Sequence, residues 1–244
     1  IDLPQVTSYD YDALLDERGN PTDKYYAVQR MLKEYYPEYP QMEPLVKESF
    51  ELGNIPLSQK VSLFETLPDL AEPIESLYPM KMEELGQNVG YLLYRTWASW
   101  DADQERLRVI DGRDRMQLYV DGQHITTQYQ TEIGQDIMVD GQKKAEHQLD
   151  ILMENMGRVN YGHKLLADTQ QKGIRTGVCK DLHFLLDWQH YPLPLDHPEK
   201  IDFSKGWQEK QPAFYAFDFK MKALKDAYLD LSDFGKGVVF VNGV

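Results

Sequence analysis

The sequence predicts a mainly β fold of jelly-roll or β-sandwich domains, preceded by a single strand–helix unit. Short runs rich in β-branched and aromatic residues recur from residue 60 onward, at a spacing of about ten residues with turn signals between them, as in sandwiches. The first part of the chain differs, because an alternating run is followed by a run of helical period. Residues 37–60 contain four prolines and no sustained period, which is typical of a linker or wrapping segment.

The N-terminal unit begins with Val6–Asp12, whose alternation places Tyr9 and Tyr11 on one face of a strand. Thr22 is the expected N-cap of the helix that follows, and Pro37 ends that helix. The apolar stripe of the helix consists of Val28, Met31, Leu32 and Tyr35. One strand and one helix cannot bury their own apolar faces. We therefore expect this unit to need the rest of a sheet.

The predicted strands cover residues 61–64, 89–97, 116–120, 123–127, 149–154, 174–180, 184–188, 213–219, 227–231 and 237–241. Asp121-Gly122 is a strong hairpin signal, and Asn242-Gly243 is another. Only Val244 follows the second turn, and the chain begins with Ile1 rather than Met. We therefore expect this sequence to be an interior piece of a longer protein.

Charge and composition exclude several classes of partner. With 40 acidic and 26 basic residues, the net charge is −14, which repels nucleic-acid phosphates and anionic lipid headgroups. The apolar runs are far shorter than the roughly 20 residues of a membrane-spanning helix. A single cysteine, Cys179, excludes an intrachain disulfide and a cysteine zinc cluster. We expect neither nucleic acid nor a membrane as a partner.

Common catalytic and metal-binding motifs are missing. The sequence has no G-x-S-x-G, Walker loop, G-x-G-x-x-G or H-E-x-x-H. His183 and His190 are expected to be ordinary surface or packed histidines, and Cys179 a buried small hydrophobe. The acidic residues of 101–105 imitate half of a calcium loop without its glycine, which favours a solvated acidic loop. No metal site is predicted.

The residues alone do not identify a site for sugar hydrolysis, and they leave the role of the tryptophans open between sugar binding and packing. Sequence spacing nominates no catalytic carboxylate pair, which must lie about 5 Å or about 6.5–9.5 Å apart in a sugar-binding cleft. The tryptophans could form a sugar-stacking platform, although packing in a core or an interface is favoured for each. These residues are Trp97, Trp100, Trp188 and Trp207.

Several segments, in chain order over almost the whole sequence, resemble one known family. The most specific of them is Leu152–Gly162. The others are Thr7–Ala13, Glu17–Thr22, Lys24–Ala27, Ser76–Pro79, Gly90–Thr96, Asp114-Arg115, Val120–Gly122, Pro212–Tyr215 and Gly235–Gly243. Together they resemble family 35 of the glycoside hydrolases, the β-galactosidases.

The resemblance implies a (β/α)8 catalytic barrel of about 250 residues followed by all-β domains. Residues 1–40 would be the last strand and helix of the barrel, 41–75 a linker or wrapping segment, 76–190 the first all-β domain, 191–211 a linker, and 212–244 the start of a second, galactose-binding-like β domain. Both catalytic glutamates, an acid/base and a nucleophile, are expected upstream of Ile1. The chain would then contain no catalytic residue.

The resemblance also implies that the parent protein hydrolyses terminal β-linked galactose from glycans with retention, and without a metal or organic cofactor. Tyr11 and Tyr9 would line the galactose pocket, because active sites of such barrels form at the ends of the strands. A tyrosine ring packs on the apolar face of a sugar while its hydroxyl hydrogen-bonds to a substituent. The alternative is that both tyrosines merely close the barrel core.

The stretch Glu154–Gly162 is expected to be structural. A turn at Asn155–Gly157, and an Arg158 that pairs with a carboxylate, would dock the β domain on its neighbours.

Two roles for this chain remain open. In one it is inactive alone, and its β domains support the remainder of their own polypeptide, the barrel, and could build a homodimer. In the other it is a non-catalytic carbohydrate-binding β-sandwich module. The lack of disulfides and of any N-x-[ST] acceptor favours a cytoplasmic enzyme, with the bacterial cell surface or secretion as the alternative.

Overall fold

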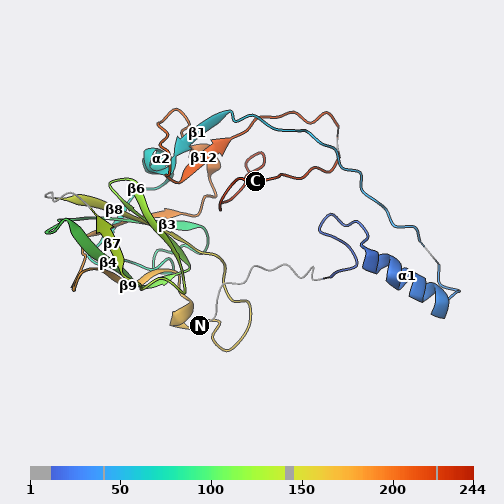
Figure 1. Ribbon diagram of the computed structural model, residues 1–244, viewed down its shortest axis with the longest axis horizontal. Coiled ribbons are helices and arrows are strands. Elements are labelled where there is room, and N and C mark those ends of the chain that lie inside the picture. Colours follow the sequence, from blue (N-terminus) through green and yellow to red (C-terminus); the bar gives the residue numbers. More distant parts are fainter. Residues whose placement is uncertain (1–11, 41, 141–145, 224) are drawn as a thin grey trace. The chain divides into compact units, whose positions relative to one another are not determined.

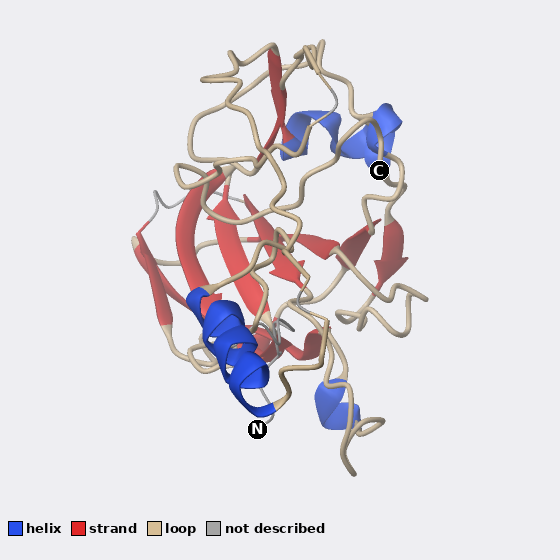
Figure 2. Cartoon of the chain, turned by 90° about the vertical axis from the view of Figure 1, so that its right-hand side faces the viewer, coloured by secondary structure: helices blue, strands red, loops and turns tan. Residues whose placement is uncertain are grey.

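The computed structural model describes residues 12–40, 42–140, 146–223 and 225–244. The chain divides into two units: among the described residues, the larger one contains 57–216 and 240–244, and the smaller one contains the residues from 12 to 56 and from 217 to 239. Strands make up most of the regular structure (Figures 1 and 2). The predicted mainly β fold is confirmed.

The larger unit is organised around a six-stranded antiparallel sheet. Its order is β2 (Ile74–Ser76), β11 (Trp188–Leu193), β3 (Tyr91–Ala98), β8 (His147–Glu154), β5 (Arg115–Val120) and β6 (Gln123–Tyr129). The central strands β3 and β8 pair over their whole length. The hairpin predicted at Asp121-Gly122 is confirmed, because both residues have positive φ angles, of 49° and 77°, and the turn joins β5 to β6.

A second, four-stranded antiparallel sheet packs on the first. Its order is β10 (His183–Phe184), β9 (Gly173–Lys180), β4 (Gln104–Arg113) and β7 (Ile137–Asp140). Alternate side chains of the two sheets form a single buried core, as in a β-sandwich. The first sheet contributes Leu92, Tyr94, Met116, Leu118, Leu149, Ile151 and Met153, and the second contributes Leu107, Val109, Ile137, Val139, Ile174 and Val178.

The outer face of the six-stranded sheet is partly covered by a short helix, α2 (Leu63–Leu70). Leu63 and Leu67 pack there against Leu93, Tyr119 and Leu152. The helix follows β1 (Gln59–Ser62), which pairs with β12 (Ala213–Ala216) in a separate two-stranded sheet. Two short 3-10 turns, η1 (Asp168–Gln170) and η2 (Pro198–Lys200), complete the regular structure.

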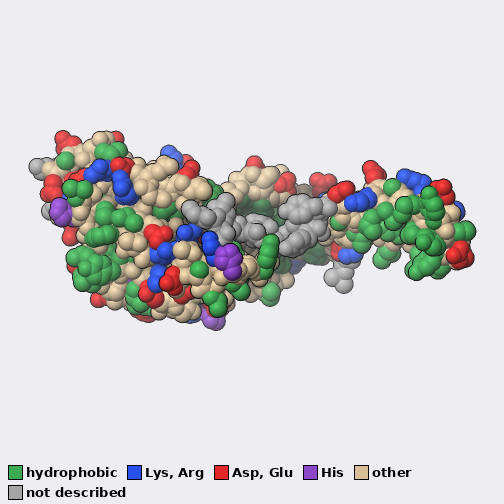
Figure 3. All heavy atoms as spheres, turned by 90° about the horizontal axis from the view of Figure 1, so that it is seen from below, with side chains coloured by type: hydrophobic (Ala, Val, Ile, Leu, Met, Phe, Trp, Pro, Cys, Tyr) green, Lys and Arg blue, Asp and Glu red, His purple; other side chains and the backbone are tan. Residues whose placement is uncertain are grey.

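The smaller unit contains the predicted N-terminal helix, α1 (Asp23–Tyr35). None of its residues is buried, and Met31 and Tyr35 of its apolar stripe are 50% and 69% exposed. In Figure 3, hydrophobic side chains, in green, gather on the surface of the smaller unit at the right-hand end of the view. Thr22 is the N-cap as predicted, but its hydroxyl donates to the carbonyls of Ala13 and Leu14 instead of capping the helix.

Two strand predictions before residue 200 are wrong. A strand predicted at 61–64 breaks after Ser62, and helix α2 lies inside the segment predicted as a linker. The reason is the spacing of Leu63, Leu67 and Leu70, which gives an apolar side that the sheet buries despite an internal Pro68. Strands β4 and β7 were not predicted. The predicted strand at 184–188 is broken, because β10 ends at Phe184 and β11 begins only at Trp188.

Two predicted C-terminal strands do not form. Residues 227–231 and 237–241 have strand-like composition but no strand partner in the described part of the chain, and Leu229 and Val238 are about half exposed, at 52% and 53%. A strand requires a neighbouring strand for its backbone hydrogen bonds. The Asn242-Gly243 turn nevertheless has the predicted geometry, since both φ angles are positive and Val241 and Val244 exchange two backbone hydrogen bonds.

Candidate functional site

The two predicted sugar-contacting residues, Tyr9 and Tyr11, lie outside the described residues. The segment that follows them is held by local hydrogen bonds. Asp16 accepts the backbone amides of Arg18 and Asn20 at 2.9 Å each, which fixes the turn before α1. Lys24 of the first helical turn bonds to the carboxylate of Asp12 at 3.0 Å. The start of the helix is thereby tied to the end of the predicted strand.

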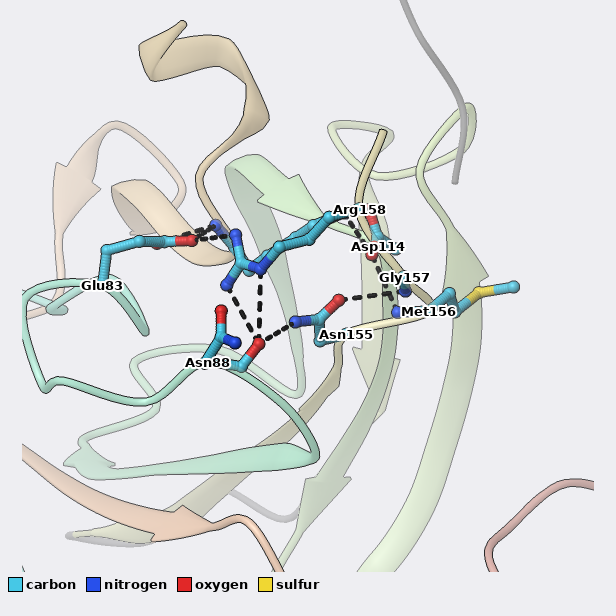
Figure 4. Close-up of polar contacts among 8 residues, drawn as sticks. Glu83, Asn88, Asp114, Asn155, Met156, Gly157 and Arg158 are labelled. Atoms are coloured by element: carbon cyan, nitrogen blue, oxygen red, sulfur yellow. Dashed lines mark hydrogen bonds and ion pairs between the residues drawn. The ribbon is translucent and has the colours of Figure 1, made fainter. Parts of the chain in front are cut away.

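In the larger unit, a network of hydrogen bonds and ion pairs anchors the turn after β8 (Figure 4). Asn155 accepts the amide of Gly157 at 3.0 Å, which closes an Asx turn, and donates to the carbonyl of Asn88 at 2.9 Å. Arg158 reaches the same carbonyl with two nitrogens and pairs with Glu83 at 2.6 Å. The prediction that Arg158 pairs with a carboxylate is confirmed.

The same site contains an ion pair that sequence analysis missed. Lys172 bonds to both carboxylate oxygens of Asp114 at 2.7 and 2.8 Å, and the two side chains are 3% and 1% exposed. Asp114 also accepts the amide of Met156, and Glu83 accepts the backbone amide of Lys172. Burial lowers the pKa of Lys172, although the hydrogen bonds and charge of Asp114 act in the opposite direction. The pair thus links three segments that are distant in sequence.

Each buried carboxylate described in the larger unit has structural partners. Asp150 binds Arg95 at 2.6 Å, and Glu154 binds Arg115 at 3.1 Å. Glu105 accepts the backbone amides of residues 101 and 102. Together with Asp114 these groups tie strands and turns to one another, and all four are buried. The site after β8 is therefore built for structure and not for acid/base chemistry.

The other sequence candidates also have structural roles. His190 is fully buried; its Nε2 accepts the amide of Met80 at 2.9 Å and its Nδ1 donates to the carbonyl of Ile74 at 2.8 Å. Burial lowers the pKa of His190. Cys179 is buried as predicted, and burial raises the pKa of its thiol. The acidic loop at 101–105 is solvated except at Glu105, which is buried and so corrects that part of the prediction.

No group of acidic, histidine or cysteine side chains suited to a metal ion occurs among the residues whose positions are described. Over the same part of the chain, no helix is long and apolar enough to cross a membrane.

The tryptophans divide into packed and exposed residues. Trp100 and Trp188 are buried in the sandwich core, as predicted. The ammonium group of Lys60 lies 3.4 Å from the centre of the Trp207 ring, a cation–π contact. Trp97 differs, since it lies on the outer face of the six-stranded sheet and is 42% exposed.

Three known family descriptions match the chain in order. Residues 1–35 match "Glycosyl hydrolases family 35", residues 79–194 match "Beta-galactosidase, first all-beta domain", and residues 212–244 match "Beta-galactosidase, galactose-binding domain". The β-sandwich, except for β2, and its anchored turn lie within the second of these. The matches define the class of the protein as a β-rich part of a glycoside hydrolase.

The curated relatives agree with this class. The chain is 36% identical to a β-galactosidase of Xanthomonas manihotis, 31% to β-galactosidase 17 of Arabidopsis thaliana and 30% to the human β-galactosidase. These alignments cover 98–99% of this chain but only 38–39% of each relative. A GH2 β-galacturonidase of Eisenbergiella tayi overlaps 49% of the chain with a TM-score of 0.35 and 14% identity, too little to establish a shared fold. The chain belongs to glycoside hydrolase family 35, the β-galactosidases, and spans about two fifths of the length of these relatives.

Proposed function

We propose that this chain is the C-terminal part of a retaining β-galactosidase that hydrolyses terminal β-linked galactose from glycans. The observation that carries the proposal is the division of the family matches. The catalytic-family description covers only residues 1–35, whereas β-domain descriptions cover 79–194 and 212–244. We propose that the two catalytic glutamates lie in the parent polypeptide outside this chain, and that the chain alone is inactive.

In the parent, one glutamate attacks the anomeric carbon while the other protonates the leaving oxygen, which gives a covalent galactosyl-enzyme that water then hydrolyses. Tyr11 and Tyr9 are proposed to line the galactose pocket at the end of a barrel strand. No metal or organic cofactor is required by this reaction.

Helix α1 supports the first part of the proposal. It has an apolar stripe but no buried residue in the described structure, although a globular helix normally buries such a stripe. We propose that the stripe packs on the remainder of the catalytic barrel. The barrel is then the partner of residues 1–40.

The β-sandwich supports the second part, a structural role. Its buried carboxylates are engaged in ion pairs and turns. The turn after β8 is bonded to two other segments, by Arg158 to Glu83 and by the Met156 amide to Asp114. A rigid turn of this kind suits docking on a neighbouring domain. We propose that the larger unit stabilises the barrel.

The experiment that tests the proposal compares the parent protein with a truncated version that ends at residue 56. The intact parent is first given methyl β-lactoside, and NMR of the anomeric proton is expected to show β-galactose as the first product. The truncated parent is expected to melt at a lower temperature and to lose activity with it. An α-galactose first product would exclude the retaining mechanism, and an unchanged melting temperature would exclude the supporting role.

A further inference from the structure

Along the strands, the outer face of the six-stranded sheet changes from an apolar end covered by α2 to a more polar, exposed end at Trp97. Outward side chains of β3 are Tyr91, Leu93, Arg95 and Trp97, because their neighbours Leu92, Tyr94 and Ala98 point into the sandwich core. Helix α2 covers the end that contains Leu93. The Trp97 end is not covered by α2, and its indole is the most exposed of the four tryptophans.

A row of planar polar groups crosses the strands beside Trp97. Neighbouring strands place Glu75 opposite Gln189, Gln189 opposite Arg95, and Arg95 opposite Asp150. On the next register position, Gln148 lies directly opposite Trp97. We call Trp97, Arg95, Gln148, Asp150 and Gln189 the Trp97 face.

The polar groups of the Trp97 face are held in place by one another. Arg95 donates hydrogen bonds to both carboxylate oxygens of Asp150, from Nε at 2.6 Å and from a terminal nitrogen at 3.2 Å. Gln148 donates to the same carboxylate at 2.7 Å. Tyr191 donates to the side-chain oxygen of Gln189 at 3.0 Å. Since Asp150 is completely buried, these hydrogen bonds fix the orientation of the groups around it.

This combination has the chemistry of a sugar-binding surface. The apolar face of a pyranose stacks on an exposed indole, and its hydroxyl groups pair with planar amide and guanidinium groups that are already oriented. Gln148 uses one amide hydrogen for Asp150, so the amide keeps another hydrogen and an acceptor oxygen for a ligand. The half-buried Gln189 and Arg95 flank it.

We propose that the Trp97 face binds a hexopyranoside, with the sugar ring stacked on Trp97 and its hydroxyl groups bonded to Gln148 and its neighbours. Asp150 is a positioning residue in this site, because it is buried and acts through Arg95 and Gln148. The site is non-catalytic and does not rest on the hydrolase assignment. It would hold the chain on glycans that present a hexopyranoside.

The test uses the full chain of 244 residues and methyl β-D-galactopyranoside as the probe, followed by NMR of the indole N–H signals. We expect saturable binding with a Kd of about 1–10 mM, the range of a small ligand on an open surface. The signal of Trp97 should shift during the titration, while those of Trp100 and Trp188 stay fixed. A flat titration up to about 50 mM, or a shift that spares Trp97, would overturn the proposal.

Two variants separate stacking from general effects. Trp97→Ala should weaken binding at least about tenfold. Tyr161→Ala removes an aromatic side chain that is 75% exposed in the loop after β8, and should leave the affinity unchanged. Equal affinity of Trp97→Ala and the unaltered chain would contradict the site. The wild-type NMR titration decides the question if Trp97→Ala fails to fold.

A third variant tests the polar row. Gln148→Ala keeps the indole and should lower the affinity by about threefold to tenfold through the lost hydrogen bonds. Methyl β-D-glucopyranoside, measured in parallel, reports whether the site distinguishes the two hexoses. Because these measurements record binding alone, a negative result leaves the proposed hydrolase function intact, and loss of hydrolysis in the parent would leave this site intact.

Discussion

At the scale of single residues, the larger unit contains an ion pair between Asp114 and Lys172. It is almost completely buried, and it connects the start of β5 to the segment before β9. We predict that Lys172→Met destabilises the chain by about 3–5 kcal/mol, because it leaves the Asp114 charge buried without its partner. The measurement is urea unfolding followed by tryptophan fluorescence.

The double variant Asp114→Asn with Lys172→Met is the control for this prediction. It removes both charges, so it should recover part of the lost stability. The account of the ion pair would fail if Lys172→Met alone changed the free energy of unfolding by less than about 1 kcal/mol.

His190 gives the protein a pH dependence of stability. Burial lowers its pKa in the folded state, whereas an unfolded chain has a histidine pKa of about 6.5. Below about pH 6.5 the unfolded state binds a proton at this histidine while the folded state does not. The contribution of neutral His190 to the free energy of unfolding is therefore complete above about pH 6.5 and decreases as the pH falls. Protonation of Nε2 would also break the bond from the Met80 amide.

The expected slope of unfolding free energy against pH, between pH 6.5 and 5, is larger in the unaltered chain than in His190→Gln. The difference has an upper limit of about 1.4 kcal/mol per pH unit, set by one proton. If the free energy of unfolding had the same pH dependence in both proteins, His190 would not be the source of the effect.

Tyr11 belongs to the proposed galactose pocket and is tested in the parent enzyme. Tyr11→Phe keeps the ring and removes the hydroxyl group, so kcat/KM for a β-galactoside should fall about tenfold to a hundredfold while the fold is unchanged. Tyr26→Phe, on the exposed surface of α1, is the matched control and should have no effect. Normal kinetics of Tyr11→Phe would favour the alternative role in closing the barrel core.

The carboxylate partner of Arg158 was predictable from the sequence, whereas the pairing of Lys172 was not. An arginine beside an Asx-type turn predicts a nearby carboxylate, and Glu83 supplies it. The partners Asp114 and Lys172 lie 58 residues apart, and only the three-dimensional packing of β5 against the segment before β9 reveals that they meet. The sequence pointed to Asp114 only as part of Asp114-Arg115, one of the segments that resemble the family.

At the scale of elements, α2 is the helix that local sequence patterns concealed. A strand-like start at Val61 and a proline at position 68 both argue against a helix. The outer face of the sheet provides an apolar surface for Leu63 and Leu67, and this tertiary burial outweighs the local preference. The hairpin at Asp121-Gly122 was predictable because its turn chemistry is local.

Burial of α2 can be measured with one substitution. Leu67 is 1% exposed against the outer face of the six-stranded sheet, so Leu67→Ala should destabilise the chain by about 2–5 kcal/mol. Leu182→Ala, at a side chain that is 84% exposed, should change stability by less than about 0.5 kcal/mol. Equal effects of the two substitutions would show that α2 does not stabilise the sheet.

The C-terminal elements show the limit of local prediction. Residues 227–231 and 237–241 have apolar and β-branched composition, yet they find no strand partner in the described structure. Strand formation depends on a partner that the local pattern does not specify. The predicted Asn242-Gly243 turn forms because a two-residue turn needs only its own positive φ angles.

At the scale of the whole molecule, the chain contains a β-sandwich with a buried core and a helix, α1, without a buried residue. The sandwich has its own core between two sheets. The apolar stripe of α1 remains on the surface. This contrast agrees with the proposal that the apolar stripe of α1 packs on the rest of a barrel, whereas the sandwich has a core of its own.

We propose that this chain is part of a β-galactosidase and is inactive by itself. The most direct test incubates the purified chain with a nitrophenyl β-galactoside, in parallel with the parent protein at the same molar concentration. The account predicts rapid release of nitrophenol by the parent and none above background by the chain. Turnover by the chain itself would contradict the account, because the catalytic carboxylates would then have to lie among these residues.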